Sequence, residues 1–166
     1  MFRSIADFLE AWKRESEKTR EILAVLTDES LATPVSPGGR TLGRIAWHVV
    51  STLGELAPRA GLPVNVAGLE GPEPPHASSL VPIYEAAAAA VAGSVGSLWT
   101  DAMLTGEIDM YGEKWTRGGT LVALIAHQTH HRGQMTVLMR QAGLKVPGVY
   151  GPAREEWVAY GMEPQP

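Results

Sequence analysis

Apolar residues recur at helical spacing in the first part of the chain. Between Phe2 and Leu26 they are three or four positions apart, with charged side chains such as Lys13 and Arg14 between them. This period places the apolar positions on one face of a helix. The pattern predicts an amphipathic helix over residues 2–26, and the proline- and glycine-rich stretch TPVSPGGRT then predicts a loop.

Three further segments have helical character. Thr41 is a candidate N-cap for a second helix that runs to about Leu56 and stops before Pro58. The alanine-rich stretch 81–103 predicts a third helix, with Ser78 or Ser79 as a candidate cap. The apolar segment 120–141 predicts a fourth helix, which Gly143 ends.

The connecting segments lack a sustained period. Residues 58–75 contain several prolines and glycines and predict a long surface loop between the second and third helices. Residues 108–115 alternate around Gly112, and Arg117-Gly118-Gly119 should end them, so that a short hairpin or an extended loop is expected there. The tail 144–166 predicts an ordered arm packed over the helices, with a short helix around residues 155–160.

These elements predict an all-α fold, with a four-helix bundle as the leading architecture and an irregular all-helical domain as the alternative. At 166 residues the chain suits one domain, residues 1–166, and we find no internal repeat. Apolar residues make up 45% and charged residues 19%, which is typical of a globular protein.

The charge and composition of the chain argue against several classes of function. The formal net charge is -4 without a basic block, which argues against nucleic-acid binding. The N-terminus lacks the pattern of a signal peptide, and the run 83–95 is too short and too weakly apolar to span a bilayer, so a cytoplasmic protein is expected. The absence of cysteine leaves histidine and carboxylate as the plausible metal ligands.

Three histidines form the candidate site. His127 and His131 are four residues apart and share one helical stripe with Gln134, a stripe predicted to face the bundle interior. Buried imidazoles need partners, and a shared cation with His48 as the third ligand would supply one. On either helix alone, the histidines could be ordinary core residues that hydrogen-bond to a neighbour. The presence of inward histidines on both helices favours a metal site. His130 projects to another side of the helix. It could be a hydrogen-bond partner of the metal ligands, a general base or a solvated residue.

Several motifs resemble those of the DinB superfamily, the DinB/YfiT-like metalloenzymes. The similar stretches are TLGRIAWHVV around His48, AHQTHHRGQMTVLMRQAGL from Ala126 to Leu144, and the following VPGVYGP. The resemblance implies an up-down-down-up four-helix bundle, association into a homodimer, and a divalent metal on His48, His127 and His131. It also implies activities such as thiol-dependent transfer with a low-molecular-weight thiol.

Three functions therefore stay open. Three neutral histidines leave coordination positions free on an ion such as zinc or nickel, which is typical of catalytic sites. The leading hypothesis is a thiol-dependent S-transferase acting on small electrophiles. The alternatives are a metal-dependent hydrolase with Glu55 or His130 as base, and a non-catalytic metal or small-ligand binding stress-response protein. Arg44 is a candidate for orienting an anionic group.

Overall fold

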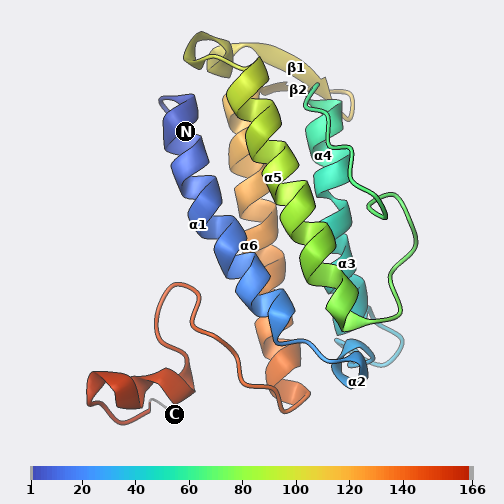
Figure 1. Cartoon of the computed structure of the whole chain (residues 1–166), viewed down its shortest axis with the longest axis vertical. Helices are drawn as coiled ribbons and strands as arrows, with labels where there is room; N and C mark the ends of the chain where they lie inside the picture. The colour runs from blue at the N-terminus through green and yellow to red at the C-terminus, as the bar shows by residue number, and fades with distance from the viewer. Residues whose placement is uncertain (1, 165–166) are drawn as a thin grey trace.

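Long helices aligned along one direction dominate the structure, a computed structural model that describes residues 2–164 (Figure 1). Two short strands and three 3-10 turns, labelled η, complete it. In chain order the elements are α1 (Ile5–Ala24), α2 (Asp28–Leu31), α3 (Leu42–Ser51), α4 (Leu53–Arg59), η1 (Ala77–Ser79), α5 (Leu80–Leu98), η2 (Asp101–Thr105), β1 (Glu107–Met110), β2 (Glu113–Thr116), α6 (Arg117–Gln141) and η3 (Arg154–Tyr160).

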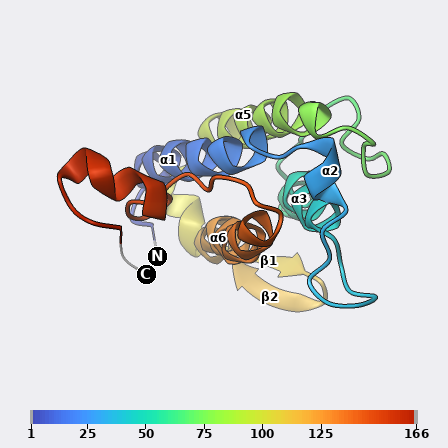
Figure 2. The same ribbon diagram turned by 90° about the horizontal axis from the view of Figure 1, so that it is seen from below.

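The long helices form two layers. Seen from below, α1 and α5 lie together in one layer, and α3 and α6 lie in the next (Figure 2). The hairpin of β1 and β2 and the loop before α3 project beyond the layer of α3 and α6 (Figure 2). Helices α1 and α6 run in one direction along the long axis, whereas α3, α4 and α5 run in the other (Figure 1).

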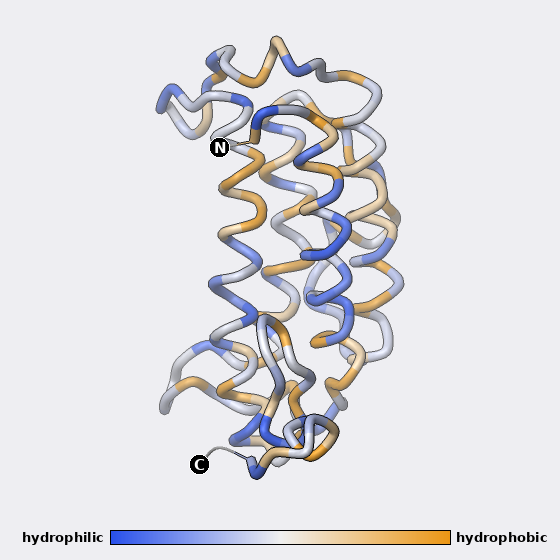
Figure 3. Tube along the Cα trace, turned by 90° about the vertical axis from the view of Figure 1, so that its left-hand side faces the viewer, coloured by the Kyte–Doolittle hydropathy of each residue, from blue (hydrophilic) through white to orange (hydrophobic). Residues whose placement is uncertain are grey.

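The core forms because apolar positions at helical spacing face one another between these layers. Apolar and polar residues therefore alternate along each helix, as the colours in Figure 3 show. Phe8 and Trp12 of α1 are buried and stack on each other, and the indole Nε1 of Trp12 donates to the carbonyl of Ala88 at 3.0 Å. The small side chains of Ala87 and Ala88 allow α1 and α5 to approach closely. The predicted amphipathic first helix is confirmed, with bounds at Ile5 and Ala24.

The predicted second helix is divided in two at Thr52. Its cap is as expected, because the Thr41 side chain accepts a hydrogen bond from the Arg44 backbone at 3.1 Å. The Thr52 hydroxyl donates to the carbonyl of His48 at 2.6 Å, a back-bond that bends helices. The predicted end near Leu56 is wrong, since α4 continues through Pro58.

The other helix ends also differ from the sequence pattern. Helix α5 ends at Leu98, before the predicted Met103, because the buried Trp99 adopts an extended conformation. Neither Ser78 nor Ser79 caps this segment by its side chain. Instead, the Asp28 carboxylate accepts from the backbone N–H of Ala77 at 2.7 Å.

The segment before α6 is a two-residue hairpin. Strands β1 and β2 pair antiparallel, and Tyr111 and Gly112 between them have φ of 61° and 82°, as a tight hairpin turn requires. The sequence predicted that Arg117 would end this segment in a loop, and that prediction is wrong. Arg117 begins α6, whose N-cap Thr116 accepts from the Gly119 backbone at 3.0 Å.

The C-terminal arm contacts the helices at a few points. The prediction that the arm packs over the helices is wrong for its segment η3. None of the residues of η3 is buried, and this turn extends away from the helices (Figure 1). Arg140 pairs with Glu155, and the Tyr150 hydroxyl donates to Glu15 of α1 at 2.7 Å. The last two residues of the predicted arm, 165 and 166, lie outside the described residues.

A buried ion pair joins α1 to α6. The guanidinium of Arg132 is 1% exposed and binds the Glu15 carboxylate, the Glu15 carbonyl at 2.6 Å and the Thr19 hydroxyl at 2.9 Å. On the same side of α6, Gln128 accepts hydrogen bonds from Thr19 and from Tyr84, each at 2.7 Å. This network was not predicted from the sequence.

Helix α5 with η1, Ala77–Leu98, is long and apolar enough to cross a membrane by length and composition, with a mean hydropathy of 1.3. The run 83–95, which alone is too short, is therefore part of a longer helical segment. A helix in the core of a water-soluble protein has the same properties, so one such segment is weak support for a membrane span.

Candidate metal centre

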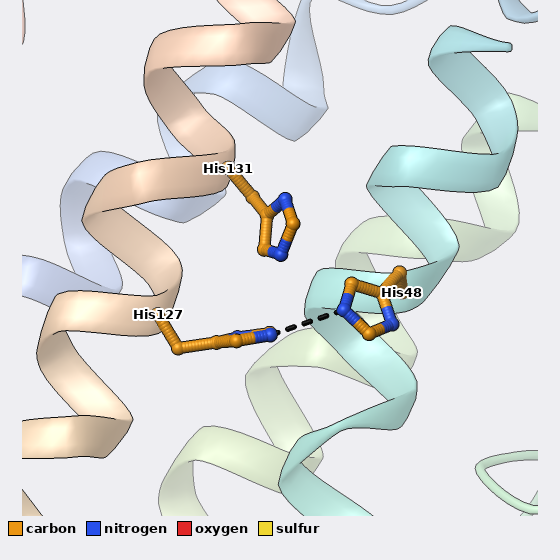
Figure 4. Close-up of side chains that lie close together, drawn as sticks. All are labelled: His48, His127 and His131. Carbon is orange, nitrogen blue, oxygen red and sulfur yellow. Dashed lines mark hydrogen bonds between the residues drawn. The ribbon is translucent and has the colours of Figure 1, made fainter. Parts of the chain in front are cut away.

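His48, His127 and His131 converge where α3 faces α6 (Figure 4). One ring nitrogen from each lies within 4.8 Å of the other two. His127 and His131 come from successive turns of α6, because side chains four residues apart project from the same face, and His48 projects from α3 opposite them. The sequence therefore predicted this cluster correctly.

Neighbouring side chains orient two of these rings. The Nδ1 atom of His131 lies 2.7 Å from the amide oxygen of Gln134, which accepts its proton. The Nδ1 atom of His48 lies 3.4 Å from the Thr52 hydroxyl, whose own proton is donated to the His48 carbonyl. Protonation at Nδ1 leaves Nε2 with a free lone pair, as a metal ligand requires.

The donor atoms fit a divalent ion. The Nε2 atoms of His48 and His127 face each other at 3.0 Å. Two imidazoles bound to one tetrahedral zinc ion, each at its usual bond length, hold their nitrogens roughly 3.3 Å apart. The spacing of the His48 and His127 nitrogens is close to that value. Three neutral nitrogens directed at one point match the preferred ligands of zinc and nickel.

The surroundings keep the imidazoles neutral. Burial, together with the neighbouring His131 and His48, lowers the pKa of His127 to about 4. Burial also lowers the pKa of His48 and of His131. Because only a neutral imidazole binds a metal, these shifts favour the form of the cluster that can act as a ligand.

The cluster is partly open to solvent. His131 is buried, whereas His48 and His127 are half-buried, so the stripe predicted to face the bundle interior is enclosed at His131 and partly exposed at His127. A cavity of about 510 Å³ does exist in the protein, but it lies between α1 and α5 and is lined by residues such as Trp12 and Ala88. The partial exposure of His48 and His127 leaves the cluster accessible to a ligand from solvent.

The other candidate residues take different positions. His130 is exposed, and its ring centroid lies 4.8 Å from that of His131. The charge of the Glu55 carboxylate partly opposes the lowering of the pKa of His48 and of His127, and this carboxylate accepts a hydrogen bond from the Tyr111 hydroxyl at 2.8 Å. Tyr111 was missed in the sequence because only the hairpin turn brings it to α4.

Four large aromatic residues have structural roles in the core or in the C-terminal arm. Trp47 and Trp99 belong to the core, and Trp115 packs partly against it. Tyr150 holds the C-terminal arm through its hydroxyl.

Replacing Thr52 with valine is expected to weaken zinc binding by roughly 10- to 100-fold, the usual cost of losing a group that orients a metal ligand. Valine keeps the shape of the side chain but cannot accept the proton of His48 Nδ1. Competition with a chromophoric chelator measures the affinity, and Thr100→Val, outside the site, is the control. Equal affinity in both variants would show that the hydroxyl does not orient His48.

The metal-free protein should lose stability as the pH falls from 6.5 to about 4. The pKa of His127 is about 4 in the fold and 6.5 ordinarily, so between these values the unfolded chain binds more protons than the folded protein does, and acid favours unfolding. Urea unfolding at pH 7 and pH 5 measures the loss. His127→Gln should reduce this pH dependence, and an unchanged dependence would contradict the assignment.

Comparison with known proteins agrees with the fold and the motifs. The chain is 43% identical over 163 residues to the uncharacterized protein YrdA of Bacillus subtilis (strain 168), which covers 98% of both chains. A crystal structure of a DinB-like protein from Bacillus cereus ATCC 10987 is 44% identical and superposes with a TM-score of 0.85, over 90% of this chain and 100% of that one.

A second crystal structure, the DinB-like protein YjoA of Bacillus subtilis, shares the fold at 17% identity and a TM-score of 0.64, over 82% of this chain and 91% of that one. The family model described as the DinB family matches residues 1–165. The resemblance that rests on His48 and on the HHRGQ stretch is thereby confirmed, and the chain belongs to the DinB family.

Proposed function

We propose that this protein binds one divalent metal ion, zinc or nickel, through His48, His127 and His131, and that it is a thiol-dependent S-transferase acting on small electrophiles. The observation that carries the metal site is the convergence of three ring nitrogens within 4.8 Å, two of them on rings oriented by Thr52 and Gln134. The thiol chemistry rests on the family resemblance and on the open side of the cluster.

The surrounding architecture belongs to the same proposal. The opposed directions of α1 and α6 against α3, α4 and α5 support an up-down-down-up four-helix bundle (Figure 1). We propose that residues 1–166 form one domain of this kind. The homodimer, the cytoplasmic location and the role in a stress response stay predictions.

The ion would supply a Lewis acid that lowers the pKa of a thiol or a water molecule held beside the histidines. Three protein ligands leave at least one position for such a ligand. In the transfer, a bond forms between the thiol sulfur and an electrophilic carbon, the bond from that carbon to its leaving group breaks, and the thiol proton passes to solvent or to a base. The half-buried rings of His48 and His127 leave room for that approach.

One observation favours a hydrolase as the second candidate. The Glu55 carboxylate acts on the pKa of both His48 and His127 and is held in place by Tyr111. A carboxylate near an activated water is the usual general base of metal hydrolases. Glu55→Gln should then abolish hydrolysis and leave metal content unchanged.

The test uses metal-free protein reloaded with zinc or with nickel. Conjugation of 2-mercaptoethanol and of 3-mercaptopropionate to a panel of aryl halides and epoxides is followed by mass spectrometry, and nitrophenyl ester hydrolysis is followed in parallel. We expect conjugation above the rate without protein, lost in His127→Ala and kept in the exposed control His76→Ala. Metal-loaded protein that conjugates no thiol to any electrophile of the panel would contradict the transferase.

A further inference from the structure

Two arginines lie on one side of the candidate metal centre, at the start of α3. Arg44 is in the first turn of α3, one turn before His48, and side chains at this spacing share a helix face. Arg40 directly precedes the N-cap Thr41. Its backbone is fixed, because the Arg40 carbonyl accepts from the Val35 backbone N–H at 2.9 Å next to the bridge that pairs Pro34 with Thr41.

Neither guanidinium pairs with a carboxylate within residues 2–164, and both residues are exposed. This distinguishes them from most other arginines of the described chain. Arginines that do pair with a carboxylate are Arg3, Arg14, Arg20, Arg132 and Arg140. Arg40 and Arg44 therefore keep their hydrogen-bonding capacity for a ligand.

Their charges lie on one side of the histidine cluster. Arg44 shares a face of α3 with His48, and Arg40 stands directly before the N-cap of the same helix. The opposite charge lies at the other end of the site, where Glu55 stands in the first turn of α4. From Arg44 to Glu55 the helical rise amounts to roughly 16 Å. The field along this face would orient a charged ligand with its negative end toward the start of α3.

We propose that Arg40 and Arg44 form an anion subsite beside the three histidines, so that the small molecule bound there carries a carboxylate or phosphate group. The inference rests on the proposed function in that the histidines hold the reacting end of the same molecule. Arginine suits this role because its planar guanidinium binds both oxygens of a carboxylate or phosphate. The two arginines would act in binding and orientation, and they would not enter the chemical step.

The test compares two thiols that differ in charge. 3-Mercaptopropionate and its neutral amide, 3-mercaptopropionamide, are titrated by calorimetry into the zinc-loaded wild type, the double variant Arg40→Gln/Arg44→Gln, and Arg14→Gln as a control on α1. Inorganic phosphate is titrated into the same proteins as a probe without sulfur. Metal content and circular dichroism establish that all three proteins are folded and loaded, which is expected because the replaced side chains are exposed.

We expect the charged thiol to bind roughly 10-fold more tightly than the amide in the wild type and in Arg14→Gln, and with equal affinity in the double variant. Equal affinity of the two thiols, with phosphate bound by the wild type and lost in the double variant, would assign the subsite to the electrophile. Phosphate and thiol affinities that are the same in the double variant as in the wild type would overturn the subsite.

Failure of the proposed function gives a different result. If neither thiol binds the zinc-loaded wild type, the thiol transferase is contradicted. Phosphate then decides the subsite alone, since its loss in the double variant supports the subsite and unchanged binding overturns it.

Discussion

Zinc should raise the free energy of unfolding of the wild-type protein by about 4 kcal/mol when the free ion exceeds its dissociation constant roughly 1,000-fold. The gain arises because the three histidines are close together only in the folded protein: His48 is 79 residues from His127 in the chain, and the unfolded chain does not hold such ligands at one point. Urea unfolding with and without buffered zinc measures it.

Removing any one ligand should remove most of this gain. His48→Ala and His131→Ala are the informative variants. His76→Ala is the matched control, because His76 is exposed and pairs with Asp28 at 2.8 Å, outside the cluster. Stabilisation by zinc that is as large in His48→Ala as in His76→Ala would place the metal elsewhere on the protein.

Replacing Glu15 with alanine should destabilise the protein by about 3–5 kcal/mol, the usual cost of leaving a buried charge without its partner. Arg132 is 1% exposed and has Glu15 as its ion-pair partner among residues 2–164. Its remaining bonds, to the Glu15 carbonyl and to the hydroxyls of Thr19, Thr129 and Tyr150, do not neutralise the charge. Urea unfolding measures the loss.

Two further variants separate charge from packing. Glu17→Ala, two residues away and exposed, should change stability by no more than about 0.5 kcal/mol. The double replacement Glu15→Leu/Arg132→Met removes both charges, and it should recover most of the stability lost in Glu15→Ala. A double variant as unstable as the single one would show that packing, and not the unpaired charge, dominates.

Local periodicity and helix propensity were sufficient to predict the long helices, and the predicted burial of two histidines on one face pointed to His48 as their third partner. Apolar residues at spacings of three and four identified α1, and the four-residue spacing of His127 and His131 placed both on one face of α6. The predicted stripe also contained Gln134, which accepts a hydrogen bond from His131. These features depend on residues within one or two helical turns.

The features that were missed depend on contacts between distant segments. The pairing of Glu15 with Arg132 joins residues 117 positions apart, and no local pattern reports it. The division of the helix at Thr52 coincides with a threonine back-bond that helix propensity does not reveal. The contact of Tyr111 with Glu55 exists only because the hairpin turn reaches α4.

Metal content tests the three-histidine centre most directly. The untagged protein, grown in zinc- and nickel-replete medium, is analysed by mass spectrometry beside His48→Ala, His127→Ala, His131→Ala and the control His76→Ala, with circular dichroism to follow the fold. We predict about one equivalent of metal in the wild type and the control, and its loss from the three other variants while they stay helical. Wild-type protein without metal, or three variants that retain it in full, would contradict the metal centre and the function proposed for it.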